Sequence, residues 1–197
     1  MSTGGQAIAQ NRARRRAQEQ TATRAAILEA ARKVGARDGA RHLSLRAVAA
    51  EAGFAPAALY GYFRNKDELL LALAADDLSL VARAMRDAGL NAPPAEKLEA
   101  AALAAVRLLQ QTETLATAPA ALSGGLAPDA ERIFNGRLIA ALRALSDVAD
   151  IKMESRDAQL DTVLLAATLT GLAVMARSGR LGALGFSAEE IVARLKT

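Results

Sequence analysis

The chain has 197 residues, of which 52% are hydrophobic and 3% are aromatic, and it contains no cysteine and one histidine, His42. This length suits one large domain or two small ones, and the apolar fraction is typical of a folded core. The missing cysteines exclude a disulfide scaffold, thiolate zinc sites and cysteine catalysis, and a lone histidine excludes the usual multi-histidine metal sites.

The net charge of +4 conceals a basic and an acidic region. Residues 1–66 contain 12 Lys and Arg against 4 Asp and Glu, a net charge of +8, whereas residues 67–197 carry a net charge of −4. Only the first third of the chain is therefore expected to meet a polyanion.

No membrane segment is predicted. The longest uncharged stretch covers residues 162–176, which is 15 residues and includes Thr and Gly, whereas a membrane span needs about 20. The N-terminal arginines are not followed by an apolar run, so no signal peptide is predicted. We expect a cytoplasmic protein.

Residues 1–20 are rich in Gln, Ala and Arg and are expected to form a flexible basic arm, with Arg12, Arg14, Arg15 and Arg16 close together. These arginines either attract phosphates without sequence preference or belong to a solvated tail. From Thr21 onward, apolar residues recur at three- and four-residue spacing, which predicts a helix that ends at Gly39.

Two short helices joined by a tight turn are predicted next. Ser44 is placed to cap a helix that ends at Gly53, and Pro56 suits the first turn of the following helix. Small residues from Ala49 to Gly53 let the helices cross closely, as a helix-turn-helix requires. The second short helix is expected to carry Leu59, Tyr60 and Phe63, with both aromatic side chains in the core.

The rest of the chain also has helical patterns. Asn65 and Glu68 form a variant of the capping box and predict a long helix towards Gly89. Further helices are predicted over residues 95–111, 113–122, 128–149, 155–178 and 187–196, with the glycine-rich residues 179–185 as a loop. We predict an all-α fold of about nine helices: a helix-turn-helix head over residues 21–66 and a helical ligand-binding and dimerisation domain over residues 67–197.

Residues 43–69, LSLRAVAAEAGFAPAALYGYFRNKDEL, resemble the DNA-binding motif of the TetR (tetracycline-repressor) family of bacterial transcription regulators. The resemblance extends back through Ile27, Ala30 and Ala31 and covers about the first 70 residues. It implies a homodimer that binds a palindromic operator on double-stranded DNA. It also implies that a small-molecule effector bound in the C-terminal domain controls this binding.

The resemblance also implies roles for individual residues. Ser44, at the N-terminus of the second helix, and Lys66, at the start of the fourth, are expected to contact phosphates. Arg46 stands at a position that often reaches DNA, and Tyr62 stands where the family contacts the DNA backbone. A hydroxyl, a helix N-terminus and a lysine all suit an anion.

The recognition helix departs from the family pattern. Where the family commonly has Ser, then Gly or Ala, then Thr, this chain has Ala55, Ala57 and Ala58, with Pro56 between. These residues offer no bidentate hydrogen bonds to bases. Specificity is expected either from thymine methyl groups on Ala57 and Ala58, or from DNA shape and the arginine arm in the minor groove. The predicted DNA-binding set is Ser44, Arg46, Pro56, Ala57, Ala58, Gly61, Tyr62, Lys66, Arg12, Arg14, Arg15 and Arg16.

The C-terminal domain is expected to hold a dimer face and an effector pocket. The apolar helix over residues 155–178 is too apolar for a lone surface helix, so we predict core on one side and dimer interface on the other. The helix from Pro128 to Ala149 is a candidate to share this interface. The predicted dimer residues are Leu164, Ala167, Gly171 and Met175. The candidate effector residues are Gln110, Thr114, Phe134, Asn135 and Thr168, or else these are caps and loop polar groups. The scarcity of aromatic residues favours an aliphatic ligand.

Three classes of function are compatible with a helical chain. A ligand-responsive TetR-like regulator, most simply a repressor released by an apolar ligand, agrees with the motif. An enzyme is disfavoured, because one histidine, no cysteine and no phosphate loop leave no catalytic constellation, and no cofactor or metal is expected. A helical dimer that binds ligand or protein, and has lost sequence-specific DNA recognition, is the alternative suggested by the alanine-rich recognition helix.

Overall fold

The structure of the protein is a computed structural model that describes residues 3–39, 42–112 and 128–195. Over these residues it has nine α-helices, one 3-10 helix and no strand, so the all-α prediction is confirmed. The chain divides into two compact units, Met1–Leu69 and Leu70–Thr197.

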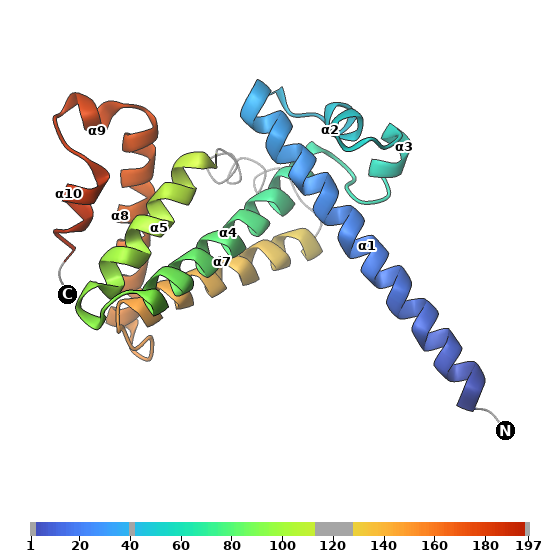
Figure 1. Ribbon diagram of the computed structural model, residues 1–197, viewed down its shortest axis with the longest axis horizontal. Helices are drawn as coiled ribbons and strands as arrows, with labels where there is room; N and C mark the ends of the chain where they lie inside the picture. Colours follow the sequence, from blue (N-terminus) through green and yellow to red (C-terminus); the bar gives the residue numbers. More distant parts are fainter. Residues whose placement is uncertain (1–2, 40–41, 113–127, 196–197) are drawn as a thin grey trace. The chain divides into compact units, whose positions relative to one another are not determined.

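The first unit contains α1 (Thr3–Asp38), α2 (Leu45–Ala52), α3 (Pro56–Leu59) and the first turn of α4 (Lys66–Asn91). Its core joins the second half of α1 to α2 and α3 through fully buried apolar side chains: Ile27, Ala31, Val34, Leu43, Val48, Ala49, Leu59 and Phe63. The N-terminal half of α1 extends past α2 and α3 of its own unit (Figure 1).

The helix α1 begins at Thr3, whereas the sequence predicts its start at Thr21 and a flexible arm before it. Ala, Gln, Arg and Glu, which dominate residues 6–20, are all strong helix formers, and no glycine or proline interrupts them. The predicted start at Thr21 depends on apolar residues that recur at helical spacing. Residues 8–22 lack this pattern because their side chains are exposed. The end of the helix at Gly39 is as predicted, since Gly39 has a φ of 82°.

The helix α3 is shorter than predicted and ends at Leu59, so Tyr60 and Phe63 lie in the turns that follow it. The core assignment is confirmed for Phe63, which is 1% exposed, but it is wrong for Tyr60, which is 54% exposed. Once the helix ends, residues 60 and 63 no longer share a helical face, and Phe63 is instead held by its N–H bond to the Leu59 carbonyl.

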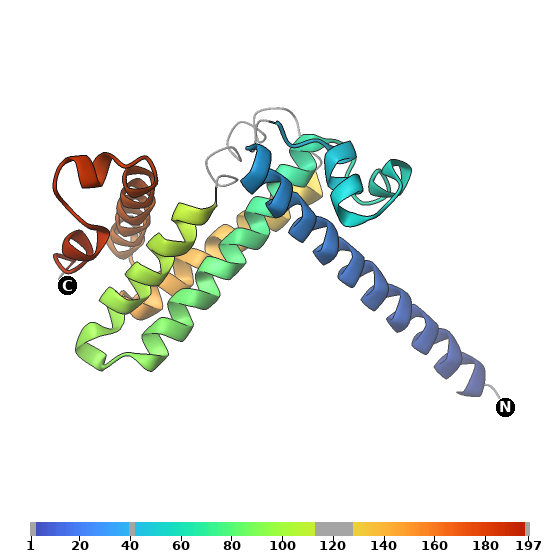
Figure 2. The ribbon, with the colours of Figure 1, turned by 45° about the horizontal axis from the view of Figure 1, so that its top comes forward.

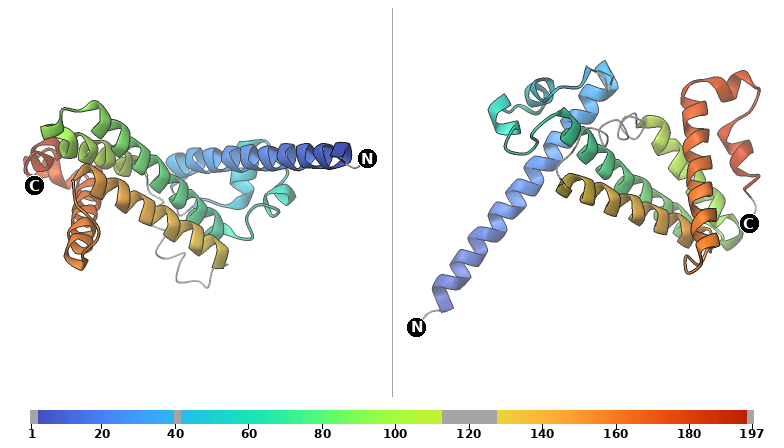
Figure 3. Two further views of the ribbon diagram at one scale, coloured as in Figure 1. Left: turned by 90° about the horizontal axis from the view of Figure 1, so that it is seen from below. Right: turned by 180° about the vertical axis from the view of Figure 1, so that it is seen from behind.

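The second unit is a helical bundle. After α4 come the 3-10 helix η2 (Pro94–Glu96), α5 (Lys97–Gln111), α7 (Pro128–Val148), α8 (Arg156–Arg177), α9 (Arg180–Ala183) and α10 (Ala188–Val192). Figure 2 shows α4 and α7 side by side, and α9 and α10 return beside α5 and α8 (Figure 3). The predicted helix over residues 113–122 lies outside the described residues, and the predicted loop over residues 179–185 contains α9.

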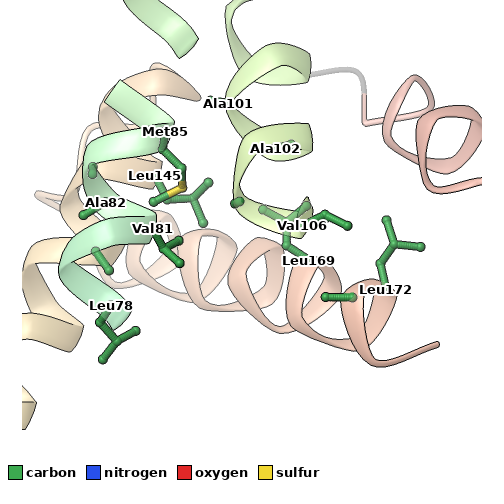
Figure 4. Close-up of a cluster of buried hydrophobic side chains, with 14 of the residues drawn as sticks. Leu78, Val81, Ala82, Met85, Ala101, Ala102, Val106, Leu145, Leu169 and Leu172 are labelled. Carbon is green, nitrogen blue, oxygen red and sulfur yellow. The ribbon is translucent and has the colours of Figure 1, made fainter. Parts of the chain in front are cut away.

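One apolar core holds this bundle together, with contributions from α4, α5, α7 and α8 (Figure 4). Small side chains such as Ala101, Ala102 and Ala105 on α5 are fully buried and let the helices approach closely. Ser155 caps α8, and Ser187 and Glu190 form the predicted capping box of α10. The helix ends are therefore fixed by the residues that the sequence indicates.

Candidate nucleic-acid interface

The helix α2 is built as a capped helix with polar residues at its exposed N-terminus. The Ser44 hydroxyl accepts a hydrogen bond of 3.1 Å from the Ala47 N–H, and Leu45, Val48 and Ala49 are buried. Ser44 and Arg46 are exposed. Free N–H groups, a hydroxyl and a guanidinium at one helix end suit a phosphate.

The turn between α2 and α3 depends on Gly53. Its φ of 73° lies in the left-handed region that favours glycine, and its N–H bonds back to the Ala50 carbonyl. The chain therefore reverses within three residues and α3 opens at Pro56, which needs no N–H partner in the first turn. This is the tight turn that a helix-turn-helix requires.

The helix α3 presents a smooth, apolar surface. Ala55, Pro56, Ala57 and Ala58 are all exposed, and none carries a polar side-chain group. Gly61 is exposed as well. Direct hydrogen bonding to base edges is therefore impossible from the side chains of α3, while van der Waals contact with a thymine methyl is possible.

Tyr62 lies beside α1 in a groove that the sequence analysis does not anticipate. The groove has a volume of about 580 Å³ and is lined by Ala17, Gln20, Thr21, Arg24, Gly61 and Tyr62. Arg24 is fixed there because its guanidinium stacks over the buried Phe63 ring, 5.2 Å from the centroid. A cation and a half-buried phenol in an open groove fit a phosphate backbone.

The start of α4 supplies the fourth predicted contact. Asn65 accepts a hydrogen bond of 2.8 Å from the Glu68 N–H, and the Glu68 carboxylate accepts one of 2.8 Å from the Arg64 N–H. Lys66, half-buried, is the first residue of the helix. The positive end of the helix dipole and the lysine therefore face the same place, where an anion would be stabilised.

Arg37 connects the ends of α1 and α2 and is occupied by acidic partners. It donates hydrogen bonds of 3.0 Å to Asp38 and 3.0 Å to Glu51. The bond from Arg37 lowers the pKa of the Asp38 carboxyl, and the same bonds raise the pKa of Arg37. This arginine positions two helices, whereas Arg46 and Arg64 are exposed.

The arginines of the expected arm, Arg12, Arg14, Arg15 and Arg16, are exposed on the helical N-terminal half of α1. An α-helix is about 10–12 Å wide with its side chains, and the minor groove is about 6 Å wide. The helix itself is therefore too wide to lie in a minor groove, into which only the arginine side chains could reach. They can still reach phosphates.

The head can now be compared with known proteins. Residues 27–73 match the family model of the bacterial regulatory proteins of the tetR family. This part of the chain is therefore similar to the DNA-binding region of that family. The match runs from the buried part of α1 to the second turn of α4, which are the elements that build the helix-turn-helix.

Solved structures extend the likeness beyond the head, to between 85% and 89% of the chain. A TetR transcriptional regulator from Rhodococcus sp. RHA1 is 22% identical, with 89% of this chain and 94% of that chain covered and a TM-score of 0.66. A TetR-family regulator from Marinobacter aquaeolei VT8 is 22% identical (89% and 93% covered, TM-score 0.57). The regulator FadR of Bacillus subtilis, solved in complex with stearoyl-CoA, is 19% identical (85% and 92% covered, TM-score 0.59). These likenesses establish the fold.

The predicted dimer residues lie together on one face of α8. Leu164 is 66% exposed and Met175 is 38% exposed, and Ala167 and Gly171 are also exposed. Leu160, Val163 and Val174 extend the same surface. The opposite face of α8 is buried in the core through Thr162, Leu169, Leu172 and Ala173. By length and composition alone this helix is also apolar enough to cross a membrane.

The candidate effector residues do not gather in one pocket. Phe134 is buried in the core, Asn135 and Thr168 are exposed, and the Thr168 hydroxyl donates to the Leu164 carbonyl of its own helix. Gln110 lines an open pocket with residues of α9 and α10, and Thr114 lies outside the described residues. The alternative, that these are helix and loop polar groups, agrees better with the structure for Asn135 and Thr168.

An apolar cavity lies instead between α4, α5, α7 and α8. It has a volume of about 90 Å³, and eleven of its twelve lining residues are apolar; the lining is Leu78, Val81, Met85, Ala105, Leu109, Leu138, Ala141, Leu142, Leu145, Ala166, Leu169 and Thr170. The Thr170 hydroxyl donates to the Ala166 carbonyl. Sequence reasoning missed these residues because apolar residues at helical spacing predict core equally well.

Proposed function

We propose that the chain is a cytoplasmic transcriptional repressor of the TetR family that binds a palindromic operator as a homodimer and is released by a small apolar ligand. The observation that carries this proposal is the arrangement of four residues on a helix-turn-helix that matches the tetR family model: Ser44 and Arg46 are exposed, and Tyr62 and Lys66 are half-buried. All four side chains suit phosphates, and they lie on one compact unit.

The dimer is supported by the exposed apolar face of α8. Large apolar patches on a soluble protein mark interaction surfaces, and this patch continues along most of a 22-residue helix. At Gly171 an added Cβ would meet no atom within 4 Å. A second helix can therefore approach the α8 backbone closely there, which favours an identical partner across a two-fold axis.

An aliphatic effector is supported by the cavity. Its lining has no charged residue and no aromatic ring. At about 90 Å³ it is smaller than the roughly 300–1,000 Å³ typical of ligand pockets, so a ligand must separate the surrounding helices in order to enter. This requirement couples binding to a change of shape, as release from an operator demands. The relative that holds stearoyl-CoA has the same fold.

Selection of DNA sequences tests the central claim. The purified chain is incubated with a random duplex library, and the bound fraction is sequenced and footprinted. We expect an inverted repeat, rich in A·T pairs where Ala57 and Ala58 face thymine methyl groups. If no inverted repeat is enriched at moderate salt, the repressor proposal is contradicted.

The phosphate role of Lys66 is tested by substitution. Lys66→Ala should weaken binding to all sequences about equally and reduce the salt slope by about one per contact. Lys152→Ala is the matched control, because Lys152 is an exposed lysine of the second unit. Equal salt slopes in both variants would contradict the assignment.

Effector binding is tested by adding stearoyl-CoA to the preformed complex with the selected duplex, with free coenzyme A as the control. We expect release by the acyl compound and none by coenzyme A alone, because only the acyl chain suits the apolar lining. Release by both compounds, or by neither, would contradict an aliphatic effector of this kind.

The second candidate function is a ligand- or protein-binding helical dimer without sequence-specific DNA recognition. It is favoured by the absence of any polar side-chain group on α3 from Pro56 to Leu59. The library selection separates the two functions. Tight binding without an enriched motif, or no binding to DNA at all, would support this second function.

A further inference from the structure

A stripe of polar side chains follows α1 from its exposed half into the head. Arg12, Arg16, Gln20 and Arg24 are spaced by four residues, so they share one side of the helix. Arg12, Arg16 and Gln20 are exposed, and no ion pair is recorded for these arginines among the described residues. We call these four residues the α1 stripe.

The inner end of the α1 stripe lines the groove beside the recognition helix. Gln20 and Arg24 form one wall of the groove, and Gly61 and Tyr62 form the other. The groove is therefore continuous with the outer, exposed part of the stripe, because both belong to one straight run of α1 (Figure 1).

Arg15 belongs to a second row, because it lies about 100° around α1 from Arg16 and about 60° from Arg12, at about 3.6 residues per turn. The row continues along the helix through Ala22, Ala26, Glu29 and Lys33, at successive spacings of seven, four, three and four residues, and all of these residues are exposed. This second row faces away from the buried row of Ile27, Ala31 and Val34. The second row carries two cations, Arg15 and Lys33, and one acidic residue, Glu29. Of the two rows, only the α1 stripe leads into the groove.

We propose that the outer half of α1 is a second DNA-binding element, in which Arg12 and Arg16 bind phosphates that flank the segment under the recognition helix. This inference rests on the proposed binding of DNA by the helix-turn-helix. Because residues 8–20 are helical, the element follows the sugar-phosphate backbone and does not enter the minor groove.

The reach of this element follows from helix geometry. The twelve residues from Arg12 to Arg24 correspond to about 18 Å at 1.5 Å per residue. Each base pair occupies about 3.4 Å of the DNA axis. The element can therefore extend the contacted DNA by up to about five base pairs beyond the contact made by Arg24.

The experiment compares two duplexes that contain the selected operator. One is trimmed to the shortest duplex that the chain still binds, and the other has six further base pairs at each end. The test variant is Arg12→Ala with Arg16→Ala. The control is Arg15→Ala with Lys33→Ala, which removes the same charge from the other row. Alanine is the best helix former, so α1 is expected to persist in both variants, and circular dichroism checks this.

The unsubstituted chain should bind the long duplex more tightly and with a steeper salt dependence than the trimmed one. The Arg12, Arg16 variant should lose that gain, with a salt slope smaller by about two per head, at about 0.9 per phosphate contact. On the trimmed duplex it should bind like the unsubstituted chain, and the control should keep the gain.

The inference is overturned if the unsubstituted chain binds both duplexes equally, or if the control loses as much as the test variant, since either result leaves only diffuse charge attraction. A failure of the proposed function looks different. In that case no operator is enriched and the trimmed duplex is not bound by any of the three proteins.

Discussion

Filling the cavity of the second unit distinguishes an effector pocket from a sealed core. Ala141 lies on α7, is 7% exposed and lines the cavity of about 90 Å³. Closing an empty cavity recovers about 24 cal/mol per Å³, which sets an upper limit of about 2 kcal/mol here. Leucine adds three carbon atoms, worth about 0.8 kcal/mol each when buried, which leads to the same magnitude. We therefore expect Ala141→Leu to raise the free energy of unfolding by up to about 2 kcal/mol.

Urea denaturation measures this change, with Ala140→Leu as the matched control. Ala140 is the exposed neighbour on α7, so its substitution tests helix propensity without filling the cavity. If the cavity is also the effector site, Ala141→Leu should keep operator binding and lose release by stearoyl-CoA. A loss of stability greater than about 1 kcal/mol would mean overpacking, and the reasoning from an open cavity would then be refuted.

Three further substitutions test the head, the dimer face and the last helix. Gly53→Ala should lower the free energy of unfolding by about 1–2 kcal/mol, because the φ of 73° strains any residue with a Cβ; Gly136→Ala, in mid-helix with open space, should instead stabilise the chain by about 0.5–1 kcal/mol. Leu164→Glu should convert the proposed dimer to a monomer, as measured by sedimentation velocity. The control Leu90→Glu, which changes another exposed leucine, should leave the dimer intact. A Leu164→Glu variant that stays dimeric would exclude this face of α8 as the interface. Ser187→Ala should cost about 1 kcal/mol through the lost cap. Hydrogen bonds from Ser187 lower the pKa of Glu190 from its ordinary value. The stabilisation of α10 by this carboxylate is therefore complete above the ordinary pKa and is lost as the pH falls through the lowered one; an NMR titration in which the Ser187 amide shift does not follow the protonation of Glu190 would contradict this.

The head was predictable because its structure is determined locally. Ser44, Gly53 and Pro56 each fix one helix end through their own backbone chemistry, and the structure has the helix ends at those places. The Asn65 and Glu68 signal works in the same way. Residues of this kind fix a helix end through local backbone chemistry, so their effect can be predicted without knowing the packing of the rest of the chain.

Two features were not predictable from such signals. The start of α1 has no cap residue and no buried face, so only the helix propensity of residues 6–20 indicates it. The cavity is lined by the same leucines, valines and alanines that form a solid core, and whether four helices leave a gap depends on how their side chains interdigitate. The polar candidates for the effector site do not line this cavity: Asn135 and Thr168 are exposed on helix surfaces, and Gln110 lines another pocket.

The helix α8 shows how composition and burial must be combined. Its apolar content satisfies a membrane helix by length and composition, yet its two faces differ in use: Leu169 and Leu172 are buried in the bundle, whereas Leu160 and Leu164 are exposed. The helix α8 is also bonded to a neighbouring element of the bundle, because the Arg177 guanidinium donates a hydrogen bond to the Thr112 carbonyl. The bundle covers the buried face of α8. The exposed apolar face is the one that the proposed dimer would cover, because a two-fold axis brings the same face of α8 from a second copy against it.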